Sequence, residues 1–249
     1  MRWHDCSMVK KTKNKKTASD KRVPFFMRPM LFIRRWLLRM VLAVAAFLVL
    51  WIAAYSLINP PTTPYIMSEG LRLGGVTREW KPIEEIAPVM ARAVVAAEDA
   101  DFCLHWGLDL DAIVEAAEDG NRGGSTISQQ VVKNAFLWHG RSYPRKGLEA
   151  LMTPVMELFW SKRRILEVYM NIAEFDEGVF GVEAAALHYF QVSSSELTRL
   201  QASRLAAILP APKSRSASRP TDFVRARTRS ILSGEATIKA DGRAACFES

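Results

Sequence analysis

An uncharged stretch near the start of the chain limits its fold more than any other feature. Residues 40–58 (MVLAVAAFLVLWIAAYSLI) contain no charged side chain and follow a segment rich in Arg and Lys. A membrane-crossing helix requires about 20 such residues, and Trp and Tyr are typical of its two ends. Trp36 stands before the run, and Trp51 and Tyr55 lie toward its far end. We therefore predict a single transmembrane helix over residues 36–58.

The basic residues before this helix predict its orientation. Residues 10–22 hold seven lysines and arginines, and basic flanks stay on the cytoplasmic side of a membrane. We expect residues 1–35 to be a basic cytoplasmic segment and the rest of the chain to be exported. A cleavable signal peptide is the alternative, but the apolar run is long for one and no clear A-x-A cleavage site stands just before Asn59. A membrane helix also argues against reading the basic segment as a nucleic-acid arm, so we expect no nucleic-acid partner.

The exported part of the chain is predicted to be mainly α-helical. Helical periodicity recurs in short segments, such as residues 86–97 and 110–117, and no series of alternating strands follows. We expect one domain over residues 59–232. Residues 233–249 show no helical periodicity, and we expect a disordered tail there.

Three cysteines occur in the chain, and only Cys103 and Cys246 would be exported. Their positions form neither a metal-binding spacing nor a disulfide framework. We therefore expect no bridge between them.

The stretch GGSTISQQVVKN, residues 123–134, is too polar to be explained as domain core. Two glycines interrupt the chain, and Thr126 followed by Gln129 is a capping-box pattern, so we predict a loop that runs into a helix. The free backbone N–H groups at such a helix start suit a phosphate or pyrophosphate. The alternative is an ordinary capped helix whose polar residues face water, and this segment alone does not decide.

Two carboxylates are candidates for chemistry. Glu98 ends an apolar helix in AVVAAEDADF, where burial would raise its pKa and allow general acid or base catalysis. Glu149 follows Arg145 by four residues and Lys146 by three, so the three share one helical turn and could form a cationic site for a phosphate. Each carboxylate also has a simpler interpretation, a solvated helix-end acid for Glu98 and a surface ion pair for Glu149.

Five segments together resemble the glycosyltransferase family that polymerises peptidoglycan glycan strands. They occur in the family's order and at family-like spacing, and they are EDADFCLHWG (98–107), GGSTISQQVVKN (123–134), RKGLE (145–149), KRRILEVYMN (162–171) and GVFGVEAAALHYF (178–190). The resemblance implies a lysozyme-like, mainly α-helical domain with a membrane-embedded jaw. It also implies an inverting reaction that polymerises lipid II into β-1,4-linked strands and releases undecaprenyl diphosphate.

The resemblance also implies roles for individual residues. Glu98 would be the catalytic base, and Glu149 would be the second catalytic carboxylate and a ligand for a divalent cation, Mg or Mn. Asp99, His105 and Asn171 would support the site. The residues that bind substrate would be Ser125, Gln129, Gln130, Lys133, Asn134, Arg145 and Lys146.

The location and partners follow from the same resemblance. It implies a single-pass protein of the bacterial inner membrane, with a cytoplasmic N-terminus and a periplasmic catalytic domain. The implied partners are lipid II, the growing glycan strand, membrane lipid, and cell-division or penicillin-binding proteins. The candidates for an apolar edge that faces the lipid are Phe102, Trp106, Phe136, Leu137 and Trp138, although aromatic clusters are more often part of a core.

Two other functions stay open at this point. A lytic transglycosylase or lysozyme-like enzyme would cleave finished glycan, but it has no need of a cationic pyrophosphate site. An inactive membrane-anchored scaffold would keep the fold without turnover. A transpeptidase domain is not expected, because the chain lacks an SxxK pattern with SDN and KTG partners.

Overall fold

The computed structural model describes residues 27–109, 124–140 and 142–248, and it divides the chain into two compact units, Met1–Phe47 and Leu48–Ser249. The described part of the first unit belongs to helix α1 (Met27–Tyr55). Residues 1–26 of the predicted cytoplasmic segment lie outside the described residues, as does the helix expected over 110–117.

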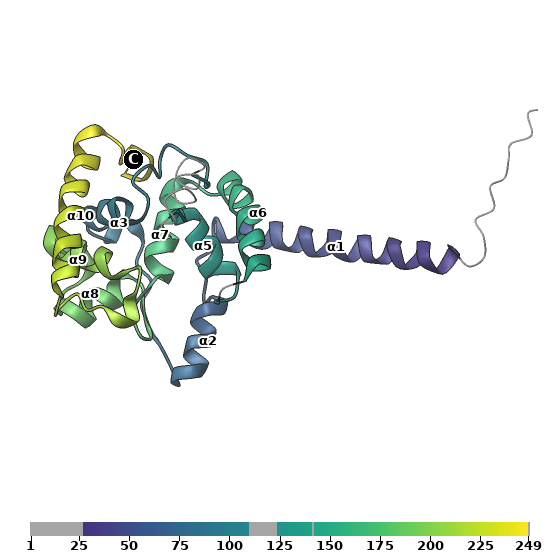
Figure 1. Cartoon of the computed structure of the whole chain (residues 1–249), viewed down its shortest axis with the longest axis horizontal. Helices are drawn as coiled ribbons and strands as arrows, with labels where there is room; N and C mark the ends of the chain where they lie inside the picture. The colour runs from purple at the N-terminus through teal and green to yellow at the C-terminus, as the bar shows by residue number, and fades with distance from the viewer. Residues whose placement is uncertain (1–26, 110–123, 141, 249) are drawn as a thin grey trace, which may run out of the picture. The chain divides into compact units, whose positions relative to one another are not determined.

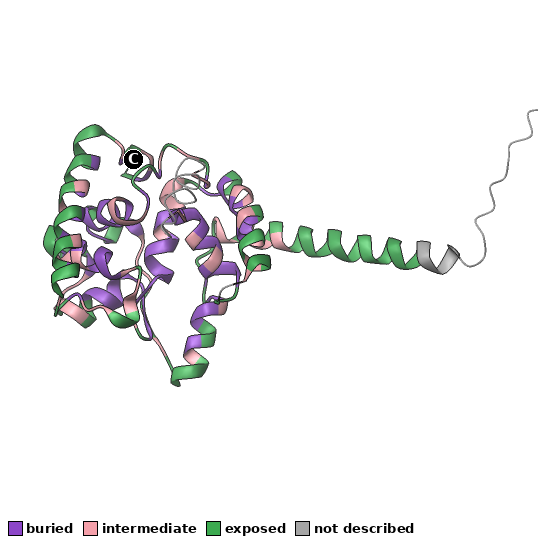
Figure 2. Cartoon of the chain, in the orientation of Figure 1, coloured by how far each residue is buried: buried purple, intermediate pink, exposed green. Residues whose placement is uncertain are grey.

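Helix α1 has the properties expected of a membrane span. Its side chains from Phe32 to Phe47 are all exposed (Figure 2). The segment Phe32–Tyr55 has a mean hydropathy of 2.5 and is long and apolar enough to cross a membrane. The predicted helix is therefore present, but it begins at Met27 rather than at residue 36 and ends at Tyr55.

The second unit is mainly helical, as predicted (Figure 1). The single-turn 3-10 helices are η1 (Ile83–Glu85), η2 (Ser194–Glu196) and η3 (Pro212–Ser214). The α-helices are α2 (Pro64–Leu73), α3 (Pro88–Glu98), α5 (Ile127–Phe136), α6 (Tyr143–Phe159), α7 (Lys162–Ile172), α8 (Val182–Phe190), α9 (Arg199–Ile208), α10 (Asp222–Asp241) and α11 (Ala245–Glu248).

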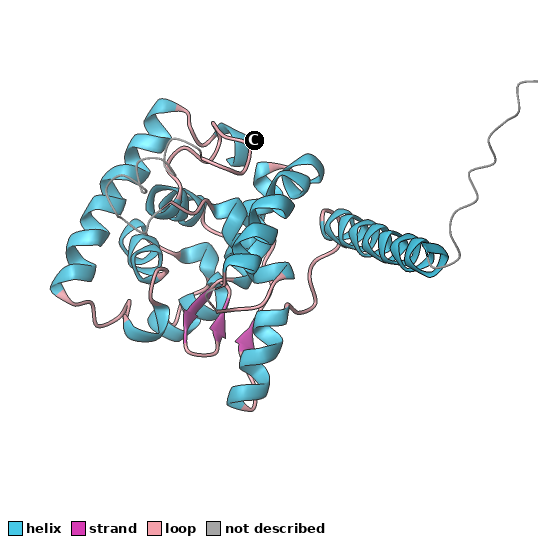
Figure 3. Cartoon of the chain, turned by 45° about the vertical axis from the view of Figure 1, so that its right-hand side comes forward, coloured by secondary structure: helices cyan, strands magenta, loops and turns pink. Residues whose placement is uncertain are grey.

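A small sheet that the sequence analysis did not predict joins two distant parts of this unit (Figure 3). Its strands are β1 (Thr77–Arg78), β2 (Glu174–Asp176) and β3 (Val179–Phe180), in the order β1-β3-β2. Strand β1 pairs with β3 in parallel, and β2 pairs with β3 antiparallel across an irregular register. Strands of two or three residues are too short for an alternating pattern to be read from the sequence.

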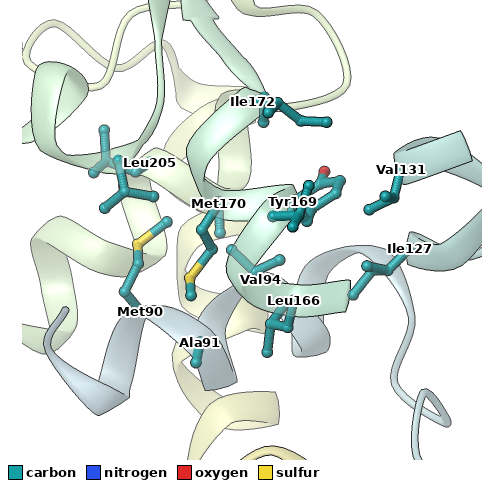
Figure 4. Close-up of a cluster of buried hydrophobic side chains, with 14 of the residues drawn as sticks. Met90, Ala91, Val94, Ile127, Val131, Leu166, Tyr169, Met170, Ile172 and Leu205 are labelled. Carbon is teal, nitrogen blue, oxygen red and sulfur yellow. The ribbon is translucent and has the colours of Figure 1, made fainter. Parts of the chain in front are cut away.

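Helix α7 is the centre of the hydrophobic core. Figure 4 shows its side chains between those of α3 on one side and those of α5 on the other. Fully buried residues from the three helices include Met90, Val94, Ile127, Val131, Leu166, Tyr169 and Met170. Burial of a large apolar side chain contributes about 1.5–3 kcal/mol, so this cluster holds the end of α3 firmly beside the start of α5.

The prediction of a disordered tail over residues 233–249 is wrong. Helix α10 continues through Asp241, packs beside α3 and α9, and is followed by α11 (Figure 1). Ile238 and Phe247 are buried, as is Glu235, whose carboxylate accepts hydrogen bonds from Arg92 and Arg199. The apolar residues of this segment show no regular helical spacing because Glu235, a charged residue, occupies a position of α10 that faces the core.

The expectation that Cys103 and Cys246 stay unpaired is also wrong. They form a disulfide with an S–S distance of 2.04 Å across a sequence separation of 143 residues. Helix α11 packs against α7, and Arg163 Nη1 donates a hydrogen bond of 2.8 Å to the carbonyl of Phe247. The tertiary packing of the C-terminus thus brings the two cysteines together, and no local sequence pattern records it.

Candidate active site

Glu98 is the last residue of α3, and its carboxylate is turned toward α5. Its Oε2 accepts a hydrogen bond of 2.9 Å from Nε2 of Gln130. Its Oε1 lies 3.7 Å from Nη2 of Arg227, and the side chain is only 10% exposed. Among the described residues, Oε1 is buried without a hydrogen-bond partner. The carboxylate is therefore hydrogen-bonded on one oxygen, while the other has only the longer ion-pair contact with Arg227.

The surroundings of Glu98 raise its pKa above the ordinary value. Burial is the main cause, since it disfavours the charged form. Asp99 acts in the same direction, whereas Gln130, Arg227 and Lys133 favour the charged form and oppose the rise. A carboxylate with a raised pKa accepts a proton more readily, which suits a general base.

Asp99 joins the end of α3 to the start of α5. Its Oδ2 accepts a hydrogen bond of 2.9 Å from the backbone N–H of Ile127, the first residue of α5. Its Oδ1 lies 2.8 Å from Nε2 of His105. The carbonyl of His105 in turn accepts a bond of 2.8 Å from Nζ of Lys162. Asp99 and His105 thus bind the loop after Glu98 to two core helices.

The start of α5 is the predicted capping box. The side chain of Thr126 accepts a bond from the N–H of Gln129, and Gln129 Oε1 accepts one of 3.1 Å from the N–H of Thr126. Gln129 is 2% exposed, so its side chain supports the helix start and does not line a cleft. The expectation that Gln129 binds substrate is therefore not supported by its position.

The first turn of α6 brings together the residues of the RKGLE segment. Glu149 Oε2 lies 2.7 Å from Nη1 of Arg145, and Glu149 Oε1 lies 2.5 Å from Nζ of Lys146. Lys146 Nζ also donates a bond of 3.0 Å to Oγ of Ser125, in the glycine-rich loop. Because Glu149 is only 3% exposed, this is not a surface ion pair but a buried carboxylate that fixes two cations.

Lys133 lies on a cleft of about 430 Å³ between α5 and the segment after α9. Among the described residues, no carboxylate lies within the 4.0 Å of an ion pair from its ammonium group, so its charge is uncommitted. Burial is the main cause that lowers the pKa of Lys133; Arg145 and Lys146 lower it further, while Glu149 opposes them. An uncommitted, partly buried cation is a strong site for an anionic ligand.

The cleft also contains residues that the sequence analysis did not single out. The hydroxyl of Tyr65 donates to Glu174, and its ring stacks on His139 with the ring centroids 3.3 Å apart. His139 Nε2 lies 3.1 Å from Oδ1 of Asn134, a predicted site residue. Lys213 completes this wall, 3.5 Å from Glu174. These residues come from α2, β2, η3 and the loop after α5, and none belongs to a recognisable motif.

A smaller hollow of about 150 Å³ is lined by Glu98 itself. Its lining includes Glu98, Asp99, Ser125 and Thr126. Gln130, which binds Glu98, lines the larger cleft. Glu98 therefore lines the smaller hollow, and its hydrogen bond to Gln130 connects it to the larger cleft.

Asn171, a predicted support of the site, does not contact the residues around Glu98. Its side chain accepts a bond of 2.8 Å from the N–H of Lys81 and donates one of 2.8 Å to the carbonyl of Lys81. These bonds join α7 to the segment between β1 and η1. Asn171 thus stabilises the domain at a distance from the candidate site.

The expected apolar edge is only partly correct. Trp106 and Trp138 are 61% and 50% exposed. Phe102, Phe136 and Leu137 are buried and belong to the core, because they pack between helices rather than outside them. Other exposed apolar side chains, which the sequence analysis did not name, are Leu104, Leu151 and Leu158.

The described residues do not fit a resident divalent cation. Both oxygens of Glu149 contact cationic side chains, and no group of three or more His, Cys, Asp or Glu residues in the described ranges is arranged so that it could hold a metal ion. A protein cage for Mg or Mn needs several oxygen ligands around one point. The side chains around Glu149 supply only one carboxylate and two competing positive charges.

Comparisons with known proteins identify the family to which the chain is similar. A protein-family model described as Transglycosylase matches residues 68–235, more than half of the chain. A biosynthetic peptidoglycan transglycosylase of Jannaschia sp. (strain CCS1) is 61% identical over 216 residues, which cover 86% of this chain and 90% of the relative. One of Caulobacter vibrioides is 45% identical over 224 residues, which cover 86% and 98%. One of Pseudomonas fluorescens is 57% identical over 155 residues, which cover 60% and 65%.

Proposed function

The chain belongs to the transglycosylase family, and from this premise we propose that Glu98 is the general base with which it extends a glycan strand. The chain is a peptidoglycan glycosyltransferase of cell wall synthesis, and lipid II and the growing strand are its substrates. One observation carries the choice of base: Glu98 is a buried carboxylate of raised pKa that lines a hollow and is hydrogen-bonded to Gln130 of the adjoining cleft.

The proton transfer follows from this position. The 4-hydroxyl of the acceptor sugar attacks the anomeric carbon of the donor, and Glu98 takes the hydroxyl proton as the new C–O bond forms. The bond between the anomeric carbon and the diphosphate oxygen breaks at the same time. A single displacement inverts the α-linked donor to a β-1,4 product. Gln130 orients the carboxylate through its bond to Oε2.

The leaving group is a lipid diphosphate, which needs its charge neutralised rather than a strong general acid. Lys133, Arg145 and Lys146 supply positive charge around it. The contact of Lys146 with Ser125 joins this cluster to the glycine-rich loop before α5, whose N-terminus also favours an anion. Glu149 holds Arg145 and Lys146 in place rather than reacting itself.

A divalent cation stays a prediction that the site residues do not support. No step of the proposed reaction uses a divalent cation, because Glu149 is already paired with two cationic side chains. If Mg or Mn takes part, its remaining ligands would have to be oxygens of the substrate diphosphate.

Peptidoglycan synthesis takes place at the cell envelope. We propose that α1 anchors the protein in the inner membrane with the N-terminus in the cytoplasm and the catalytic unit in the periplasm. The apolar segment Phe32–Tyr55 and the basic residues before it support this orientation. A substrate with a polyprenyl tail stays in the bilayer, so exposed side chains such as Trp106 and Leu158 are suited to contact lipid. Cell-division and penicillin-binding proteins stay predicted partners.

The experiment uses the detergent-solubilised full chain with labelled lipid II, and it resolves glycan products on a gel. Wild-type protein should make long strands, and Glu98→Gln should lower the initial rate roughly 10²–10⁴-fold, since the amide cannot accept the proton. Glu177→Gln is the matched control, because Glu177 is half exposed and lies in an ion pair with Arg72 away from the site. Strand growth by folded Glu98→Gln protein at the wild-type rate would refute the choice of base, and shortening of preformed glycan by wild type would favour a lytic enzyme.

A further inference from the structure

Residues 242–248, which we call the C-terminal clasp, contact the loop that follows Glu98. The family model ends at residue 235, so the clasp lies beyond the matched region. The disulfide between Cys246 and Cys103 attaches the clasp to this loop covalently. Arg243 Nη1 adds hydrogen bonds of 3.1 Å to the carbonyl of Ala100 and 3.2 Å to Oδ1 of Asp101. Three successive parts of the loop are thus held from the same side.

The other face of the clasp is fixed to the core. Glu248 pairs with Arg92 of α3, and Arg163 of α7 donates a bond of 2.8 Å to the carbonyl of Phe247. Phe247 itself is 1% exposed. Gly242 has a φ of 79°, a left-handed conformation that favours glycine and ends α10 with a sharp turn toward the loop. The clasp is therefore anchored on the two helices that form the centre of the domain.

Apart from Phe102, which is fully buried in the core, the middle of the loop has few contacts besides those with the clasp. Within it, Phe102 N donates to Asp99 O at 3.1 Å and Leu104 N to Asp101 O at 2.7 Å, which are single turns. Leu104 is 71% exposed. The functional contacts lie at its two ends, where Asp99 and His105 bond to each other beside Glu98. A loop that moved between these ends would disturb the contact between Asp99 and His105, next to Glu98 in the chain.

We propose that the clasp is a positioning device that holds residues 99–106, and through Asp99 and His105 the base Glu98, in the catalytic arrangement. This inference rests on the proposed function of Glu98. No clasp residue lines the cleft at Lys133 or the hollow at Glu98. Lys133, Arg145 and Lys146 lie on α5 and α6, so substrate binding should depend on the clasp much less than the proton transfer does.

The simpler account is that the disulfide only stabilises the folded domain by restricting the unfolded chain. The two accounts differ in the kinetics of folded protein. A stabilising bond alone leaves kcat unchanged below the unfolding temperature. A bond that positions the base changes kcat at these temperatures as well, because misplacing a catalytic group by about 1 Å can lower the rate roughly 100-fold.

The test uses the full chain in detergent, in a Cys6→Ser background so that only the bonded pair remains. Initial rates are measured against lipid II concentration for the oxidised protein, for the Cys103→Ser/Cys246→Ser variant, and for both after treatment with dithiothreitol. Reduction adds two electrons and two protons to the disulfide, giving two thiols, while dithiothreitol becomes its cyclic disulfide. The double variant is the control for dithiothreitol, because it has no bond to reduce.

The expected result is a kcat lower by roughly ten- to hundred-fold in the reduced protein and in the double variant, with KM within about two-fold. Arg243→Met should lower kcat in the same way, and Arg243→Lys should restore part of it by keeping a cation near Asp101. Hydrogen exchange of residues 99–106 should accelerate when the disulfide is absent. Circular dichroism at the assay temperature verifies that each protein is folded.

The possible failures are distinguishable. Wild-type polymerisation with an unchanged kcat in the folded double variant would overturn the clasp and leave the proposed function standing. If wild type made no strands, the proposed function would fail, and the clasp would fail with it as a positioning device for Glu98. Unchanged exchange of residues 99–106 without the disulfide would overturn the clasp whatever the activity.

Discussion

Arg227, on helix α10, brings its guanidinium to 3.7 Å from the carboxylate of Glu98 at the end of α3. Its Nη2 also donates a hydrogen bond of 3.0 Å to the carbonyl of Ala97, so the guanidinium is fixed beside the base. Among the described residues, Nε of Arg227 and Oε1 of Glu98 are both buried without a hydrogen-bond partner. The distance therefore leaves a charge interaction that stabilises the ionised base without closing a direct bond.

Substitution of Arg227 should move the pH dependence of the reaction. The positive charge opposes the rise in the pKa of Glu98 that burial causes. Arg227→Gln should therefore raise this pKa further, and because the base must be ionised to work, the acid limb of kcat/KM should shift to higher pH. Arg227→Lys should shift it less. The measurement is the rate of lipid II polymerisation over about pH 5–9.

Other charged or titratable groups around Glu98 stay in place in this experiment. Asp99 follows it in the chain, Lys133 faces it from α5, Tyr169 from α7, and Arg215 from the segment before α10. None of these groups is altered, so the difference between the two profiles reports the charge at position 227. An acid limb at the same pH in Arg227→Gln and wild type would contradict this role.

Removing the charge of Lys133 should lower the activity without lowering the stability of the folded protein. Burial already lowers the pKa of its ammonium group, and no described carboxylate pairs with it, so removal of the charge relieves a desolvation cost. We expect Lys133→Met to lower the polymerisation rate roughly 10²-fold, through loss of a cation at the leaving group, with an unchanged or higher unfolding midpoint. Lys133→Arg should retain more activity. A clearly lower midpoint in Lys133→Met would show that the residue is structural.

The sequence predicted features that depend on neighbours along the chain. The uncharged run specified α1, and Thr126 with Gln129 specified the start of α5, because a capping box is complete within four residues. The same local pattern could not tell that Gln129 would be buried and thus unable to line the cleft. Burial depends on what packs over a helix, which short-range spacing does not contain.

The features that the sequence analysis missed depend on distant contacts. Arg227 reaches Glu98 only because α10 packs on α3, and Cys246 reaches Cys103 only because α11 packs on α7. Tyr65 and Lys213 meet at the cleft from opposite ends of the domain. The resemblance of five segments still indicated the region of the site, since those segments carry Glu98, Lys133 and Glu149.

Glu149→Gln should destabilise the domain as well as lower activity. The carboxylate is buried between Arg145 and Lys146, and a neutral amide would leave two adjacent cations without compensation. Removing one partner of a buried ion pair costs about 3–5 kcal/mol, and the exposure of Lys146 favours the lower end of this range. Thermal unfolding of the full chain in detergent measures the effect. Glu177→Gln is again the control, and an equal midpoint in the two variants would contradict a buried role for Glu149.

Glu235 should be essential to the part of α10 that the sequence did not predict. Its side chain is 1% exposed and pairs with Arg92 and Arg199, so Glu235→Gln leaves the mostly buried Arg92 with only Glu248 as an acidic partner. We expect a loss of about 3 kcal/mol in the free energy of unfolding and a midpoint lower by roughly 6–12 °C. The matched control is Asp222→Asn on the same helix, whose carboxylate is 98% exposed and should matter little.

The stability difference between wild type and Glu235→Gln should also depend on pH, and its sign follows from the pKa of Glu235. Burial alone would raise the pKa of Glu235, but Arg92 and Arg199 outweigh it and hold the pKa below the ordinary value. A lowered folded pKa stabilises the protein above the unfolded value of about 4.3, and this stability is lost as the pH falls through the folded pKa. Wild type should therefore lose stability relative to Glu235→Gln as the pH is lowered below about 4.3. A constant difference between the two midpoints across that range would show that Glu235 acts through packing rather than through its charge.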